Sequence, residues 1–107
     1  MPIQGVIKQA KIDTASSGDN TIVAAVSAET IKVWKIFFWV NGTVSVTIKD
    51  GAGTNLTGAM AMVAQNQFNK WLDETVPWFV CTQGNALVIN LGSAIQISGR
   101  VYYTQQA

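Results

Sequence analysis

Six carboxylates are the side chains of this protein best suited to acid–base chemistry, and no histidine accompanies them. A pair such as Asp50 with Glu74 could serve as the acid and the base of a glycosidase. Ser-His-Asp triads, Cys-His pairs and histidine-containing zinc sites are excluded without histidine. Because most of the carboxylates fall in loops or at strand ends, we interpret them as solvated groups and expect no enzyme. They are Asp13, Asp19, Glu29, Asp50, Asp73 and Glu74.

Two loops carry oxygen atoms that a calcium ion could use, residues 13–19 and residues 50–55. Neither loop has the acidic density of an EF-hand. The run Gly51-Ala52-Gly53 precedes no expected helix and lacks a lysine at the spacing of a phosphate-binding loop, so it is typical of a turn. We therefore expect no metal and no cofactor.

Cys81 is the only cysteine, so no disulfide can form within the chain. A cysteine nucleophile usually needs a histidine base, and none is present. We therefore expect Cys81 to be a small buried apolar residue in a protein that folds in a reducing cytoplasm.

Four tryptophans are many for a chain of 107 residues. Two of them, Trp71 and Trp78, follow a segment rich in glutamine and asparagine at residues 65–69. Tryptophans beside amides could pack in the core or at a sheet edge, could form the energetic centre of a protein interface, or could stack on a sugar. All three interpretations stay open from the sequence.

The charge content limits the partners that the chain can have. Only 12% of the residues are charged, against about 25% in average domains. Seven basic and six acidic residues give a net charge of +1, and the bases are scattered along the sequence. A dedicated nucleic-acid binder would concentrate its bases, so we expect no nucleic-acid partner and little long-range steering.

No segment is suited to crossing or entering a membrane. The most apolar stretch, Ile31–Val40, has about ten residues and includes two lysines, whereas a membrane-spanning helix needs about 20. Residues 1–12 contain no apolar core of signal-peptide length. We therefore expect a soluble chain with no membrane partner.

The elements that must position these residues are short alternating segments separated by Gly, Asn, Asp and Ser. Segment 64–77 is expected to be a long loop or a single helical turn. Strands recurring about every ten residues favour one antiparallel β-sandwich or barrel over βαβ units. We predict a single domain over residues 1–107, an all-β sandwich of about eight strands. The expected strands are residues 4–12, 21–26, 31–40, 43–49, 56–63, 78–82, 86–91 and 94–104.

The Asn41-Gly42 dipeptide between two apolar segments is typical of a two-residue type I′ hairpin. In that hairpin, residues directly opposite each other share a face of the sheet. The expected outer face then carries Trp34, Ile36, Phe38 and Val40. Lys35 on the expected inner face disagrees with this register, and a slip of one residue would exchange the two faces. The inner face is expected to carry Val33, Phe37, Trp39, Val44, Val46 and Ile48.

An outer face of four large apolar side chains would exceed the contiguous apolar surface that monomers usually expose. The cover could be segment 64–77, the N-terminal strand, or a neighbouring subunit. Our candidate interface residues are Trp34, Ile36 and Phe38, with Trp71 and Trp78 as second candidates. On that hypothesis, Trp34→Asp combined with Phe38→Ser should leave the fold intact and yield monomers.

Five stretches of the chain, each a turn or strand motif, have a familiar pattern. They are Met1–Ile7, Asp13–Val23, Gly51–Met60, Gly84–Leu87 and Ser98–Tyr103. Together they resemble small virion proteins of tailed bacteriophages, as a diffuse pattern over nearly the whole chain with no catalytic motif. The resemblance implies a jelly-roll-like sandwich that decorates or cements the capsid surface. It implies the major capsid protein as partner, a homotrimer as assembly, and synthesis in the bacterial cytoplasm.

A tight hairpin at residues 41–42 is in tension with this resemblance, because most consecutive strands of a jelly roll cross between sheets. Either the topology is a variant, or residues 41–42 turn a corner and the face assignment fails. The rival functions are a receptor- or carbohydrate-binding tip of a phage fibre or tail, and a small lyase or glycosidase on a cupin-like sandwich. The last is disfavoured because cupin metal sites usually use histidine.

Overall fold

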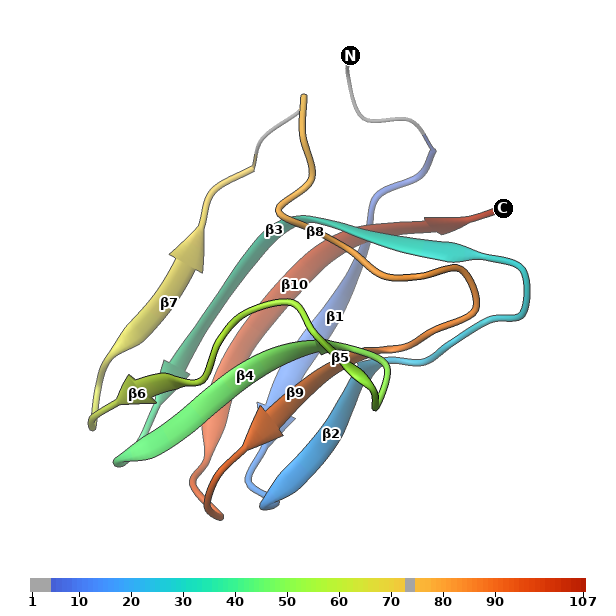
Figure 1. The fold of residues 1–107 in the computed structure, drawn as a ribbon. Coiled ribbons are helices and arrows are strands. Elements are labelled where there is room, and N and C mark those ends of the chain that lie inside the picture. Colours follow the sequence, from blue (N-terminus) through green and yellow to red (C-terminus); the bar gives the residue numbers. More distant parts are fainter. Residues whose placement is uncertain (1–4, 73–74) are drawn as a thin grey trace.

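The computed structural model describes residues 5–72 and 75–107 as two antiparallel sheets packed face to face, and these residues contain no helix (Figure 1). None of the described residues therefore forms a helix that could cross a membrane. The predicted all-β sandwich is confirmed. The strands are β1 (Lys8–Thr14), β2 (Gly18–Val23), β3 (Thr30–Val40), β4 (Val44–Asp50), β5 (Thr54–Asn55), β6 (Met60–Met62), β7 (Gln67–Lys70), β8 (Phe79–Val80), β9 (Leu87–Leu91) and β10 (Ile97–Gln106).

The strand order is that of a jelly roll. One sheet, here called the β3 sheet, has the order β1-β10-β3-β7, with β8 also paired to β3. The other, the β4 sheet, has the order β2-β9-β4-β5, with β6 also paired to β4. The first four strands alternate between the two sheets, and each pairs with a strand from the later part of the chain. The antiparallel pairs are β1–β10, β2–β9, β3–β7 and β4–β6.

The ten strands fill eight positions, because two edge strands are interrupted. β5 and β6 pair with opposite ends of β4. The expected strand over residues 56–63 is thus reduced to β6, and β5 lies in the expected loop at residues 50–55. β7 and β8 pair one after the other with the same strand, β3, and the connection 71–78 separates them. The expectation of a loop or helical turn over residues 64–77 is therefore wrong for β7, where Phe68 and Lys70 alternate with more exposed amides.

The predicted hairpin at Asn41-Gly42 is wrong. β3 and β4 lie in different sheets, and residues 41–43 turn the corner between them. The Asn41 amide donates to the Gln96 carbonyl, 3.0 Å away, and so joins the turn to the start of β10. β4 pairs with β9 instead of β3, which buries both strands' apolar faces at once. A favourable local turn sequence therefore does not decide the strand pairing here.

The face assignment of β3 is also wrong, since Ile36, Phe38 and Val40 point into the core. Phe37 and Trp39 point outward and remain 37% and 46% exposed. The reason is the missing hairpin: β3 does not pair with β4, so the inward Val44 does not place Trp39 on the inner face. Val33 still points inward because of a β-bulge, in which Tyr102 pairs with Lys35 and Tyr103 with Val33, so that Trp34 has no partner on β10. One extra residue reverses the alternation between the two halves of the strand. The inward assignments of Val33, Val44, Val46 and Ile48 are confirmed.

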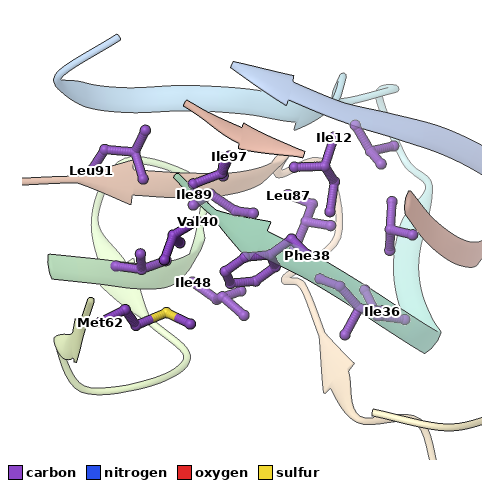
Figure 2. Packing of buried hydrophobic residues seen from close by; sticks show 14 of the residues in the cluster. Ile12, Ile36, Phe38, Val40, Ile48, Met62, Leu87, Ile89, Leu91 and Ile97 are labelled. Atoms are coloured by element: carbon purple, nitrogen blue, oxygen red, sulfur yellow. The ribbon is translucent and has the colours of Figure 1, made fainter. Parts of the chain in front are cut away.

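The core is a single apolar layer between the two sheets. Figure 2 shows Phe38 at its centre, surrounded by side chains of both sheets such as Ile36, Ile48 and Leu87. The Phe38 ring stacks on the Phe68 ring at 5.3 Å between centroids, which ties edge strand β7 to the core. The core thus fixes which side of β3 faces solvent.

Candidate functional site

Asp50 is buried and is fully used by the fold. Its carboxylate accepts hydrogen bonds from the Thr82 amide (2.9 Å), the Thr82 hydroxyl (2.6 Å) and the Asn85 side-chain amide (3.0 Å). Burial by itself raises the pKa of Asp50, but these hydrogen bonds outweigh burial and hold the pKa below its usual value. Its suggested catalytic partner, Glu74, lies outside the described residues, as does Asp73.

The remaining carboxylates that the loops could have offered to calcium are engaged with neighbouring side chains. Asp19 accepts from Asn90 (2.7 Å) and Lys49 (3.1 Å), and these contacts lower its pKa. Asp13 accepts from Gln96 at 2.8 Å. Within residues 5–72 and 75–107, no group of three or more His, Cys, Asp or Glu side chains could hold a metal ion.

Cys81 lies in the core, as expected. Burial, with a further contribution from the charge of Asp50, raises the pKa of its thiol to about 12. The thiolate that a nucleophile requires is therefore not formed near neutral pH.

The five candidate interface residues separate into two groups. Trp34, Ile36 and Phe38 are covered by the chain itself, and the Trp34 indole donates to the Thr104 hydroxyl at 3.0 Å in the interior. Trp71 and Trp78, in the connection between β7 and β8, are 70% and 42% exposed. The structure therefore leaves only the two second candidates with side chains available to a partner.

The exposed aromatic residues gather on the outer side and at the edge of the β3 sheet. We call Phe37, Trp39, Trp71, Trp78 and Tyr102 the aromatic face. Phe37 and Trp39 point outward from β3, and Tyr102 pairs with Lys35 on the same side. The Trp78 indole donates to the Trp71 carbonyl, which fixes the two tryptophans relative to each other at the sheet edge.

Lysine ammonium groups lie against four of these five rings, all but Trp39. The Lys35 ammonium lies 5.1 Å from the ring centroids of both Trp71 and Tyr102, and 6.0 Å from that of Phe37. The Lys70 ammonium lies 5.4 Å from the Trp78 ring. Each contact is within the range of a cation–π interaction. Lys35 therefore joins the rings of Phe37, Trp71 and Tyr102 through one cation.

The sequence interpretation missed Phe37 and Trp39 because it placed them inside. The signal that could have found them was Lys35, whose charge did not fit the expected inner face. A shift of one residue after position 33, which the bulge at Trp34 supplies, places Lys35 and both rings outside.

An open groove of about 360 Å³ lies at the end of the β4 sheet. Its lining is mainly apolar and contains no ionisable side chain, so the groove offers no acid–base chemistry. It is lined by Thr43, Val44, Ser45, Ala61, Met62, Val63, Gly92 and Ser93.

Comparison with solved structures finds the same fold in a phage particle. The protein is similar to a chain of the acidic stable capsid structure of Helicobacter pylori bacteriophage KHP30, with a TM-score of 0.63 and 18% sequence identity. The alignment covers 96% of this chain and 90% of that chain, so the two folds correspond from end to end. No protein-family model and no curated protein matches the sequence.

Proposed function

We propose that the protein is a non-enzymatic structural component of a phage virion that decorates or cements the capsid by binding the major capsid protein. The observation that carries the proposal is the correspondence of its whole fold with a chain in a phage capsid structure. The exposed aromatic face supports it, since exposed tryptophans are typical of the energetic centre of protein interfaces. The fold's own use of Asp50 and Cys81 leaves neither of them for catalysis.

The mechanism of such a protein is mass action. A protein that binds only the assembled shell stabilises it by RT ln(1 + [L]/Kd) per site. No covalent chemistry is needed, and stabilisation grows with the number of occupied sites. Trp71 and Trp78 are the side chains that we propose for this contact, because both are exposed and the Trp78 indole is hydrogen-bonded to the Trp71 carbonyl.

The proposal is tested with capsids prepared without the protein. Wild-type protein should co-sediment with the shells in a saturable manner, and Trp71→Ala with Trp78→Ala should weaken binding at least tenfold. Val26→Ala, which alters an exposed apolar residue between β2 and β3, is the matched control and should bind normally. Equal binding of all three proteins would remove the two tryptophans from the interface.

A homotrimer, which the phage resemblance predicts, is a separate part of the proposal. Light scattering coupled to size exclusion measures the solution mass directly. Three times the chain mass of 11.5 kDa is the expected value. A monomer at every concentration tested would refute the trimer, while leaving capsid binding by single copies intact.

The second candidate function is carbohydrate recognition at the tip of a phage fibre or tail. It is favoured by the pairing of Trp39 with Gln67 and of Phe37 with Asn69, which sets amides beside exposed rings. If the protein binds glycans, loses that binding in Trp39→Ala and has no affinity for capsids, carbohydrate recognition is its function and the capsid proposal is wrong.

A further inference from the structure

The fold collects the bases that are scattered along the sequence. Six of the seven lie on strands of the β3 sheet, whose described strands contain a single carboxylate, Asp13. The strands of the β4 sheet hold Lys49, Asp19 and Asp50. A net charge of +1 for the whole chain therefore conceals a basic sheet. Part of that charge is not on its outer side, because Lys8 and Lys70 register with the inward-pointing Tyr103 and Ile36, and Asp13 lies in the outward row of Trp39. The bases of the β3 sheet are Lys8, Lys11, Lys32, Lys35, Lys70 and Arg100.

Two of these bases stand directly opposite each other. Lys11 of β1 pairs with Arg100 of β10, and Arg100 pairs in turn with Phe37 of β3. These side chains share the outer side of the sheet, and like charges facing each other across strands destabilise a sheet. Their partners are only weak, because Lys11 reaches Asp13 at 3.5 Å in an exposed pair and Arg100 reaches the neutral Gln9 at 3.2 Å. The fold thus maintains a positive site at some cost in stability.

The rings and the charges form one surface. The row Lys11–Arg100–Phe37 lies next to the row that contains Trp39, and on its other side Lys35 and Tyr102 continue toward Trp71. Apolar rings occupy the middle of the sheet and cations lie beside them. Aromatic centres with charged surroundings are the usual anatomy of protein interfaces.

We propose that the outer side of the β3 sheet docks an acidic protein surface, with Phe37 and Trp39 as the apolar centre and Lys11 and Arg100 as the charge-pairing groups. The proposal deepens the proposed function and rests on it for the partner's identity, which would be a capsid subunit. Charge complementarity selects the partner's chemistry, because acidic groups would relieve the Lys11–Arg100 repulsion.

A second copy of this chain does not supply that acidic surface through its β4 sheet. Asp19 is paired with Lys49, and Asp50 is buried and satisfied by Thr82. A nucleic acid fits less well than a protein, because two of the six cations on this sheet, Lys35 and Lys70, already lie against rings. Binding that follows the phosphate backbone requires a continuous series of available cations.

The test variant is Lys11→Glu, which replaces a repulsive cross-strand pair with an attractive one. We expect its melting temperature to stay within about 4 °C of wild type, because the gained attraction to Arg100 and the lost contact with Asp13 oppose each other; a loss of binding by the folded variant then cannot be ascribed to misfolding. Thr21→Glu combined with Ala52→Glu, both at exposed positions on the β4-sheet side, lowers the net charge by the same two units and is the matched control.

The probes are a soluble peptide of repeated Glu-Glu-Leu-Gly units, its Lys-Lys-Leu-Gly counterpart, and oligo-dT of matched charge, titrated at low ionic strength by calorimetry. We expect the acidic peptide to bind most tightly of the three probes. Lys11→Glu should weaken its affinity about tenfold, and the control variant should bind it with an affinity within twofold of wild type. Tighter binding of oligo-dT, equal losses in both variants, or no binding of the acidic peptide would each overturn the proposal.

Capsid binding separates this proposal from the proposed function. If capsids bind wild-type and Lys11→Glu proteins equally, the capsid role stands and the docking face is wrong. If the acidic peptide binds through Lys11 while capsids bind neither protein, the proposed function fails and the acidic docking surface stands.

Discussion

Asp50 shows how a single residue that could have been catalytic is instead structural. Its carboxylate receives three hydrogen bonds from Thr82 and Asn85 and so joins the end of β4 to the segment between β8 and β9. These bonds favour the ionised form in the folded state more than in the unfolded state. Asp50 therefore links stability to pH.

We predict that this linkage is lost in Asp50→Asn. Because folding lowers the pKa of Asp50, its stabilisation is complete above the ordinary aspartate pKa of about 4 and disappears as the pH falls through the folded-state value. The variant should be less stable by about 1–3 kcal/mol at pH 7, and the difference should shrink in acid. Urea unfolding followed by tryptophan fluorescence at several pH values measures this. A difference that stays constant down to the lowest pH would contradict the assignment.

Two neighbouring phenylalanines provide a second prediction at this scale. Phe38 is 1% exposed and stacks on Phe68, whereas Phe37 points outward. Phe38→Ala should cost about 3–5 kcal/mol of unfolding free energy, while Phe37→Ala should cost less than about 1 kcal/mol. Denaturant midpoints of the two variants compare them directly. The reverse order would restore the face assignment expected from a hairpin at Asn41-Gly42.

At the scale of elements, β10 runs antiparallel beside β3, and the two backbones come very close at Gly99. A Cβ atom on Gly99 would overlap the Phe37 carbonyl oxygen and the Phe38 Cα, both of them backbone atoms that cannot move aside alone. Gly99→Ala should therefore lower stability by about 1–3 kcal/mol or more. Gly53→Ala, whose Cβ would meet nothing within 4 Å, is the control and should leave the melting temperature nearly unchanged. Equal melting temperatures for the two variants would show that the sheet accommodates the added atom.

Most strands could be predicted from the sequence, because alternation in segments such as Leu87–Leu91 is strong and local. The pairing of strands could not. Asn41-Gly42 is a genuine turn signal, but nothing in it says whether the next strand returns along β3 or crosses to the other sheet. The bulge at Trp34 was equally hidden, since it depends on the register with β10 some 70 residues away.

The candidate site, too, could be predicted only in part from the sequence. Trp71 and Trp78 stood out by type and lie exposed, whereas Trp34 and Phe38 stood out by type and lie inside. The bases seemed dispersed because strands that are neighbours in the β3 sheet are distant in the sequence. Surface composition is set by topology, and only the folded chain reveals it.

At the scale of the whole molecule, the protein is a jelly roll with two unlike outer sides. The β3 sheet carries most of the bases and the aromatic face, whereas the charges of the β4 sheet are paired or buried. A protein that attaches to a shell through one side and faces solvent with the other would have this asymmetry. Under the proposed function, that shell would be a phage capsid.

The capsid role is decided by titrating the purified protein onto capsids that lack it, with co-sedimentation and shell disruption by heat as the two readouts. We predict saturable binding and a disruption temperature that rises with occupancy, as expected when only the assembled state is bound. Absence of binding at concentrations well above micromolar, with the protein shown to be folded, would contradict a role on the capsid.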